Sequence, residues 1–271
     1  MSRDQQAVRT ILEAVKSEGR SSLSSDEARE LCQAYDIPTP GQGLATSADD
    51  AVSLSDSVGY PVVLKIESPD ILHKTDAGGV IVGLTTADEV RDAFEEISAN
   101  AKAYNASASI SGVQVQQMLP AATEVIVGAV TDPTFGKLTA FGLGGTLVEV
   151  LGDMTFRLAP TPADQAMSML DDISGAEVLA GIRGAAPVDR SALASIVENV
   201  GALVGDFPEI DELDLNPVMA SSEGATAVDV RILTDFNPKP ARFRPSHDDI
   251  LSAMQRVMQP DGVAVIGASA E

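Results

Sequence analysis

Two helix-start signals, with one apolar run between them, limit most strongly what this chain can fold into. Ser24 with Glu27, and Thr86 with Glu89, have the spacing of a capping box, in which two side chains satisfy backbone N–H groups at the start of a helix. Each box opens an amphipathic segment, which predicts helices in SSDEARELCQAY and in TADEVRDAFEEISANAKAY. Between them lies YPVVLKI, a short and almost wholly apolar run. This run predicts a strand that is buried on both faces.

Strand patterns dominate the rest of the chain. GVQVQQML alternates polar and apolar residues, and EVIVGAV and KLTAFGL follow it with the turn DPTFG between them. DRSALASIVENVGALV predicts another amphipathic helix, and ELDLNPV and TAVDVRI alternate again. Because strands and helices do not follow a regular βαβ series, we predict an α+β architecture of mixed sheets covered by helices.

Composition and charge exclude several classes of protein. At 271 residues and 44% hydrophobic, the chain can bury a sizeable core. No apolar run approaches the roughly 20 residues that span a bilayer, and the polar start MSRDQQAVRT has no signal-peptide core, so we expect a cytoplasmic protein without membrane contact. A formal charge of −22 disfavours nucleic acid as a partner. This charge is spread along the chain, and we expect a salt-rich cytoplasm that screens it.

Polar residues share one face on two strands predicted near the end of the chain. Asp214 and Asn216 lie on one face of ELDLNPV, and Asp229 and Arg231 lie on one face of AVDVRI. If the two strands pair as a hairpin, their oxygen atoms can converge on Mg²⁺, which takes a few carboxylate or amide oxygens and completes its shell with water and phosphates. Taken alone, the pattern more often marks ordinary exposed polar positions on a half-buried sheet.

Two further features admit both a chemical and a structural interpretation. Lys65 interrupts the apolar run, where a charge needs a partner, and either a nucleotide phosphate or an ordinary ion pair can supply it. Gly142, Gly144 and Gly145 in FGLGGTLVE could bring backbone N–H groups close to phosphate oxygens. Glycines between strands are, however, commonly just turns.

His73, in ILHKTDAGGV, is one of only two histidines in the chain. A neutral imidazole is a good nucleophile near pH 7, and the glycines that follow would let its loop move. A lone loop histidine is more often a surface or structural residue, and His247 in the proline-rich stretch keeps that interpretation. The sequence has no nucleophile elbow, HExxH motif or cysteine pair, which argues against serine hydrolases and metal-cluster proteins.

Taken in order, these segments resemble a known family. GYPVVLKIESPDILHKTDAGGV, TEVIVGAVTDPTFG, FGLGGTLVEVLGDMTFRLAP and ELDLNPV with AVDVRI resemble the ATP-grasp subunit of ADP-forming acyl-CoA synthetases, in the succinyl-CoA synthetase superfamily, over roughly residues 20 to 235. The resemblance implies an ATP-grasp fold, two α/β lobes that clasp a nucleotide. It also implies an acid–thiol ligase that interconverts acyl-CoA, ADP and phosphate with free acid, CoA and ATP, commonly with acetate as the acid.

The resemblance further implies roles for single residues. His73 resembles the second histidine of a relay that passes a phosphoryl group from acyl phosphate, through a histidine of a CoA-binding partner unit, to ADP. Asp214 resembles the acidic residue that assists this phosphohistidine at the nucleotide site. Lys65 resembles a phosphate-contacting lysine, and Asn216 and Asp229 resemble the Mg²⁺ ligands.

Two other groups of positions match the family. The first resembles the segment between the lobes that contacts adenine and ribose, and the second resembles a glycine loop and its following acid, expected to line the site. The first group is Gln116, Met118 and Glu124, and the second is Gly144, Gly145 and Glu149.

The chain is expected to have four parts. Residues 1–20 form an N-terminal helix, and residues 21–235 form the ATP-grasp domain, with the smaller lobe at about 40–115. Residues 236–257 form a proline-rich linker and a helix, and residues 258–271 resemble the first strand of a Rossmann-like CoA-binding domain whose remainder is absent. We therefore expect a piece of a longer fused polypeptide, or a chain that works with a separate CoA-binding partner in a hetero- or homo-oligomer.

Two alternatives remain open at this point. The same domains occur fused to protein acetyltransferases, where the ATP-grasp part can act as a regulatory module; the intact HKTDAGG segment and the magnesium pair argue against this. A different ATP-grasp carboxylate ligase would not need His73, so phosphorylation of that residue separates the two enzymes.

Overall fold

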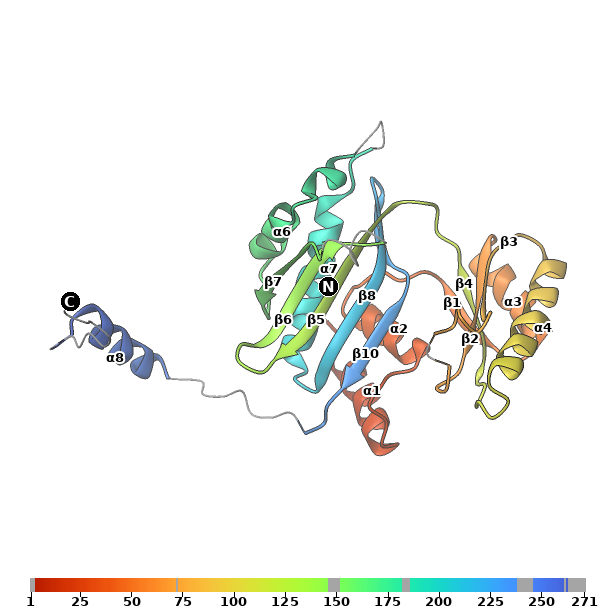
Figure 1. Ribbon diagram of the computed structural model, residues 1–271, viewed down its shortest axis with the longest axis horizontal. Helices are drawn as coiled ribbons and strands as arrows, with labels where there is room; N and C mark the ends of the chain where they lie inside the picture. The colour runs from red at the N-terminus through yellow and green to blue at the C-terminus, as the bar shows by residue number, and fades with distance from the viewer. Residues whose placement is uncertain are drawn as a thin grey trace, which may run out of the picture.

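A computed structural model describes residues 3–71, 73–145, 152–181, 186–237, 246–260 and 262. Two sheets, each with its own helices, form two lobes (Figure 1). Each lobe has a separate apolar core. The α+β class predicted from the sequence is confirmed, but every strand pairing among the described residues is antiparallel, so the expectation of mixed sheets is wrong.

The smaller lobe is a four-stranded sheet in the order β1-β4-β2-β3, with helices α3 and α4 packed against it (Figure 1). Its elements are β1 (Gln42–Ala45), α3 (Ala48–Val58), β2 (Val62–Glu67), β3 (Val80–Leu84), α4 (Ala87–Tyr104) and β4 (Gly112–Gln117). The strand predicted in YPVVLKI is β2, and the five residues from Val62 to Ile66 are all buried, as predicted.

The larger lobe is a six-stranded sheet in the order β10-β8-β5-β6-β7, with β9 also paired to β8, and α7 packs against it. Its helices are α1 (Gln5–Ser17), α2 (Ser25–Ala34), α6 (Ala163–Asp172), a 3-10 turn (Ala176–Ala180) and α7 (Arg190–Asp206). Its strands are β5 (Thr123–Asp132), β6 (Gly136–Leu143), β7 (Met154–Leu158), β8 (Ile210–Ser221), β9 (Gly224–Ala227) and β10 (Val230–Thr234).

Both predicted capping boxes are present. Ser24 and Glu27 cap α2, and Thr86 and Glu89 cap α4, with both hydrogen bonds of the box made in each case. Of the apolar positions at helical spacing in α4, Val90, Ile97 and Ala101 are buried and Phe94 is partly buried, but Tyr104, the last residue of the helix, is 56% exposed.

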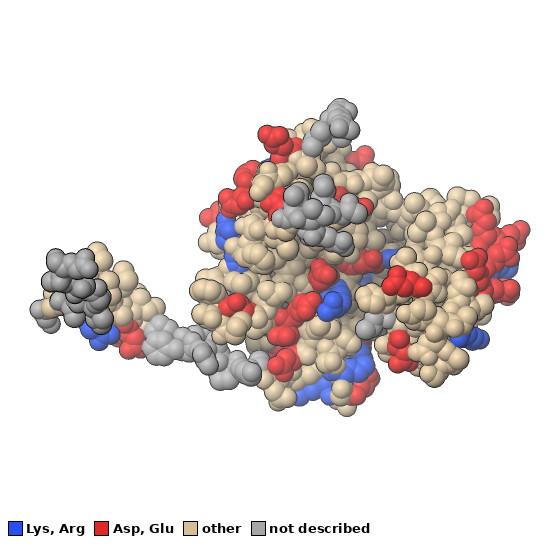
Figure 2. Space-filling model, in the orientation of Figure 1, with Lys and Arg blue, Asp and Glu red and all other residues tan. Residues whose placement is uncertain are grey.

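The last helix, α8 (His247–Met258), has no buried residue, and Figure 1 shows it apart from both lobes. The predicted start of a CoA-binding domain falls outside the described residues except for residues 258–260 and 262. Within the ranges that the structure covers, no helix combines the length and apolar character needed to cross a bilayer. Figure 2 shows acidic side chains on both lobes, in keeping with an excess of charge spread along the chain.

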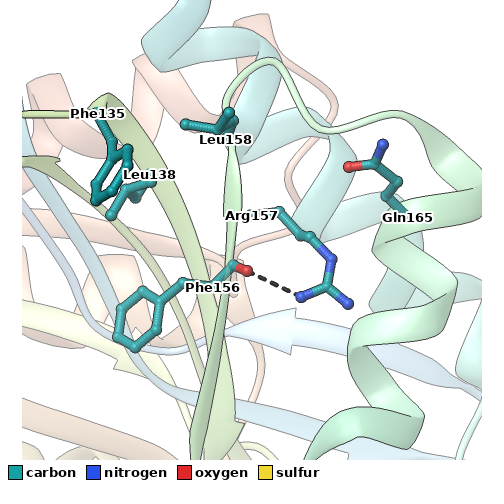
Figure 3. Close-up of a pocket in the computed structure, with 6 residues that line it drawn as sticks. All are labelled: Phe135, Leu138, Phe156, Arg157, Leu158 and Gln165. Atoms are coloured by element: carbon teal, nitrogen blue, oxygen red, sulfur yellow. Dashed lines mark hydrogen bonds between the residues drawn. The ribbon is translucent and has the colours of Figure 1, made fainter. Parts of the chain in front are cut away.

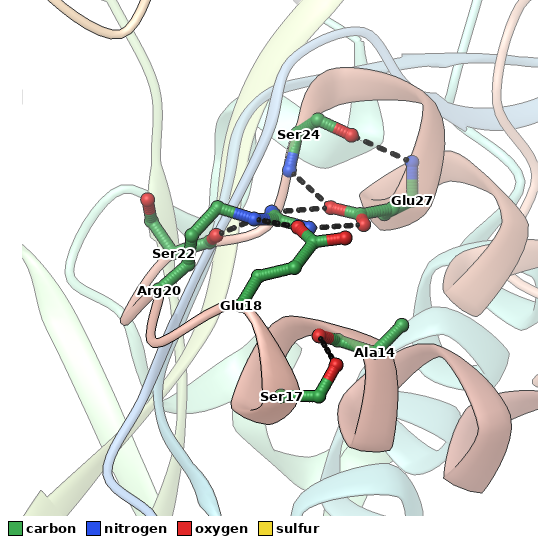
Figure 4. A network of polar contacts seen from close by, with 7 residues as sticks. All are labelled: Ala14, Ser17, Glu18, Arg20, Ser22, Ser24 and Glu27. Atoms are coloured by element: carbon green, nitrogen blue, oxygen red, sulfur yellow. Dashed lines mark hydrogen bonds and ion pairs between the residues drawn. The ribbon is translucent and has the colours of Figure 1, made fainter.

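An arginine network joins α1 to α2 (Figure 4). The Arg20 guanidinium donates to both carboxylate oxygens of Glu27, at 2.6 and 2.8 Å, and to Glu18 at 2.7 Å. Because a bidentate, charge-assisted pair favours the carboxylate, Arg20 lowers the pKa of Glu27 from 4.5 to about 2. Glu27 also accepts the backbone N–H of Ser24, so the same carboxylate binds Arg20 and caps α2.

We expect Glu27→Gln to reduce the acid sensitivity of folding. A carboxyl group whose pKa is depressed in the folded state stabilises the protein above its unfolded value of 4.5, and this contribution is lost as pH falls towards about 2. Glutamine can keep the capping box but not the charge, so the variant should lose about 1–2 kcal/mol at neutral pH after solvent screening. Urea unfolding from pH 7 to 2 measures this, and parallel curves for wild type and variant would contradict it.

Candidate functional site

An ion pair crosses between the two lobes. The Lys65 ammonium on β2 pairs with the carboxylate of Asp229, which lies between β9 and β10 of the larger lobe. Lys65 is only 9% exposed, whereas the Asp229 side chain is 55% exposed. A buried ammonium group needs such a partner. The predicted phosphate-binding lysine and the predicted metal ligand are therefore brought into direct contact.

The predicted hairpin near Asp229 is also present. β8 pairs with both β9 and β10, and the two residues between those strands lie opposite Asn216 and Pro217. The Asn216 N–H donates to the Asp229 carbonyl at 3.2 Å, and the Val228 N–H donates to the Pro217 carbonyl at 2.9 Å. Asn216 is exposed next to the buried Leu215, and its backbone pairs with that of Asp229, so the Asn216 amide and the Asp229 carboxylate come from paired positions of the hairpin.

These two side chains fit a magnesium ion. A carboxylate and an amide oxygen are hard ligands of the kind that Mg²⁺ accepts, and both are exposed to solvent. Among the described residues no three His, Cys, Asp or Glu side chains gather as a metal site. Two protein ligands are nevertheless a suitable set, because Mg²⁺ at a nucleotide site usually keeps water and phosphate oxygens in its shell.

Asp214 lies on β8, two residues before Asn216 and on the same side of the strand. Its backbone partners in register are Gly128 on β5 and Arg231 on β10. Burial raises the pKa of Asp214, while Arg231 opposes this shift and Glu212 adds to it. A half-buried carboxylate of this kind can accept a hydrogen bond from an imidazole N–H that approaches it.

Gln116, on β4, links the lobes through its side chain. It is 2% exposed, and its amide nitrogen donates to Gln42 at 3.0 Å and to the Val228 carbonyl at 2.9 Å. Val228 directly precedes Asp229, so the amide group of Gln116 holds the backbone next to the predicted metal ligand. Met118, just after β4, is 38% exposed and its N–H donates to the Pro61 carbonyl at 2.9 Å.

Glu124 and the glycine turn lie against each other. The Gly144 N–H donates to the Glu124 carbonyl at 2.8 Å, and a Cβ on Gly144 would sit 2.8 Å from the Glu124 backbone carbon. The close approach of two backbones therefore requires a glycine there. A Cβ on Gly145 would lie 3.3 Å from the Glu124 carboxylate. The structure thus brings these three predicted residues together, while Glu149 lies outside the described residues.

His73 lies in the loop between β2 and β3 and is exposed. The loop is closed by the N–H of Gly79, which donates to the Lys74 carbonyl at 2.8 Å. A Cβ on Gly79 would meet Ile66 at 2.5 Å and the Lys74 carbonyl at 3.0 Å, so this glycine permits tight packing of the loop base against β2. We expected the glycines to let the loop move; at Gly79 the physical reason for glycine is this close contact.

Several residues at the site escaped sequence reasoning, notably Gln42, Ser25 and Glu67. The Ser25 hydroxyl at the start of α2 donates to Glu67 at 3.0 Å, which makes a further contact between the lobes. The one available signal was position: Glu67 is two residues from Lys65 on the same strand and therefore shares its face.

A depression of about 480 Å³ lies elsewhere, over β6 and β7 (Figure 3). It contains none of the predicted site residues, and its lining is mostly apolar. The lining residues are Phe135, Leu138, Phe156, Arg157, Leu158 and Gln165. Its one cation, Arg157, is already paired with Asp172. This surface therefore offers little to a nucleotide phosphate.

Comparison with known proteins decides the family. A family model described as an ATP-grasp domain matches residues 14–233, which is most of the chain. The chain belongs to the ATP-grasp family. The resemblance inferred from the ordered motifs, and the ATP-grasp fold it implied, are thereby confirmed.

Relatives of this ATP-grasp chain include ADP-forming CoA ligases. It is 45% identical over 225 residues to the β subunit of acetate–CoA ligase (ADP-forming) I of Pyrococcus furiosus, a match that covers 83% of this chain and 97% of that subunit. It is 44% identical over 224 residues to 4-hydroxybutyrate–CoA ligase (ADP-forming) of Nitrosopumilus maritimus, covering 82% of this chain but only 32% of that protein.

A solved structure shares the fold. Acetyl-coenzyme A synthetase 1 of Ca. Korarchaeum cryptofilum is 38% identical, with a TM-score of 0.76 over 84% of this chain and 100% of that chain. It was solved in complex with coenzyme A and Mg-AMPPCP, with its phosphohistidine segment pointing towards the nucleotide-binding site.

Proposed function

We propose that this chain is the nucleotide-binding part of an ADP-forming acyl-CoA synthetase, with acetate as the expected acid. It relays a phosphoryl group through His73 between a CoA-binding partner and ADP or ATP. The observation that carries the proposal is the contact of Lys65 with Asp229 across the lobes, together with an exposed histidine in the loop that leaves the strand of Lys65.

For phosphoryl transfer, the protein mainly has to position the reacting groups and offset negative charge on the phosphates. In the direction from ATP, a ring nitrogen of His73 forms a bond to the γ-phosphorus while the bond to the ADP oxygen breaks. Lys65 offsets negative charge on the phosphates, and Mg²⁺, when held by Asn216 and Asp229, would offset charge on them as well. The imidazole becomes cationic as the N–P bond forms, and the Asp214 carboxylate can accept its remaining N–H.

The placement of Lys65 implies an exchange of partners. In this structure its ammonium group is satisfied by Asp229. Binding of nucleotide phosphates together with a cation would give both groups new partners of opposite charge, so the pair can be replaced without leaving a buried charge unsatisfied. Lys65 would therefore bridge the two lobes when no nucleotide is bound and contact the phosphates when a nucleotide lies between them.

The proposed partner is a CoA-binding, α-type subunit or domain. Support comes from the P. furiosus relative, which is named as a β subunit, and from the N. maritimus ligase, of which this chain matches 32%. We infer that the complete reaction requires this partner in a hetero- or homo-oligomer. A cytoplasmic location remains our prediction.

Incubation with Mg²⁺ and γ-labelled ATP at high salt tests the proposal. We expect stoichiometric label that survives alkali, as a phosphohistidine does, that is removed by added ADP, and that needs the divalent ion. Phosphopeptide mapping locates it. The absence of label, with ATP still bound and a CoA-binding partner present, would contradict the relay and favour a regulatory module.

A further inference from the structure

Glu67, the last residue of β2, contacts two other parts of the molecule through its side chain. Its Oε2 atom accepts the Lys74 ammonium at 2.6 Å and the Ser25 hydroxyl at 3.0 Å. Lys74 belongs to the His73 loop, and Ser25 begins α2, which packs in the core of the larger lobe. One carboxylate therefore ties the loop of the smaller lobe to a helix of the larger lobe.

The position of Glu67 on its strand fixes which surface the loop meets. Residues two apart on a strand point to the same face, and Lys65 and Glu67 both contact the larger lobe, through Asp229 and Ser25 respectively. The distance along the strand between them is about 7 Å. The Lys74 side chain is thus held on the face of β2 that contacts the larger lobe, here called the cleft face. Its partner Glu67 is the next residue on that face after Lys65, the proposed phosphate-binding lysine.

Lys74 is held by its backbone as well as its side chain. Its carbonyl accepts the Gly79 N–H at 2.8 Å, and a Cβ on Gly79 would lie 2.5 Å from Ile66, so this end of the loop packs closely on β2. At the start of the loop, the Asp70 carboxylate accepts the Ser109 N–H at 2.7 Å. Of these contacts, the ion pair with Glu67 is the one that connects the loop to a side chain that also contacts the larger lobe.

We propose that Glu67 is a positioning residue for the phosphohistidine: its ion pair with Lys74 holds the loop on the cleft face of β2, where His73 exchanges its phosphoryl group with the nucleotide. Opening of the pair would release the Lys74 side chain from that face. The two side chains are 28% and 20% exposed, so the pair is partly shielded from solvent and screened less than a surface pair. This inference rests on the proposed role of His73.

The test is the rate of His73 labelling by γ-labelled ATP at saturating nucleotide. We expect Glu67→Gln and Lys74→Gln each to slow labelling about 10-fold, because small misplacement of a nucleophile is costly, with the nucleotide Kd unchanged. The charge-swapped double variant, Glu67→Lys with Lys74→Glu, should recover to within about 3-fold of wild type, because it restores the pair.

A matched control is Asp171→Asn, which breaks the Arg190–Asp171 pair (2.6 Å) on the larger lobe and should label at the wild-type rate. Thermal unfolding checks that each variant is folded. If Glu67→Gln does not fold, Lys74→Gln still tests the ion pair. Wild-type rates in both single variants, or a double variant slower than either, would overturn this inference alone. A wild-type chain that never labels His73 would overturn it together with the proposed function.

Discussion

His73→Ala is expected to remove all alkali-stable label that the chain acquires from γ-labelled ATP. In the proposed relay His73 is the nucleophile itself, and alanine offers no atom that could form the N–P bond. The side chain is exposed, and the hydrogen bond that closes the loop joins the backbones of Lys74 and Gly79, so removal of the imidazole should leave the fold intact. Quantified phosphopeptides over a time course provide the measurement.

The chain supplies its own control, because His247 is its only other histidine. It lies at the start of α8, a helix without buried residues. We expect His247→Ala to acquire label at the wild-type rate. Label that persists in His73→Ala, or that is lost only in His247→Ala, would contradict the assignment of the nucleophile.

The parts of the fold that were predictable from sequence are those set by local rules. A capping box involves residues three apart, so it predicts the start of a helix without reference to the rest of the molecule. This holds for Ser24 with Glu27 and for Thr86 with Glu89. The short apolar run likewise predicts β2 as a strand that is buried on both faces. Tyr104 shows where such rules fail: it follows the helical period but falls on the last residue of α4, where it is 56% exposed.

At the candidate site, the faces of the residues were predictable and their partners were not. Alternation on β8 correctly placed Asp214 and Asn216 on one face, and the hairpin that sets Asn216 beside Asp229 followed from two adjacent strand patterns. The pairing of Lys65 with Asp229 joins residues 164 positions apart. The motif pattern named both residues separately, and only the packing of the lobes brings them together.

The glutamine and glutamate contacts between the lobes were missed for the same reason. Gln116 and Val228 are 112 positions apart, and Ser25 and Glu67 are 42 apart. No periodicity relates such pairs. The glycines after His73 had a local interpretation, loop mobility, but at Gly79 the structure shows a contact with Ile66 that depends on which side of β2 the loop packs.

Lys65→Met is expected to slow phosphoryl transfer to His73 by about 10²–10³-fold, the range typical for loss of one preorganised group that stabilises developing charge. The effect should be large because Lys65 is 9% exposed, and charge interactions strengthen where water is excluded. Methionine keeps much of the apolar stem that packs in β2. The Asp229 side chain left behind is 55% exposed and can be solvated, so the fold should tolerate the change.

Comparison with Lys102→Met separates this local effect from a general loss of positive charge. Lys102 lies exposed in the last turn of α4, and on a chain of charge −22 the two variants change net charge equally. Only Lys65→Met should impair labelling and weaken ATP binding. Equal rates in both variants would mean that Lys65 serves solely to pair with Asp229, and the phosphate-binding role would pass to another cation of the cleft.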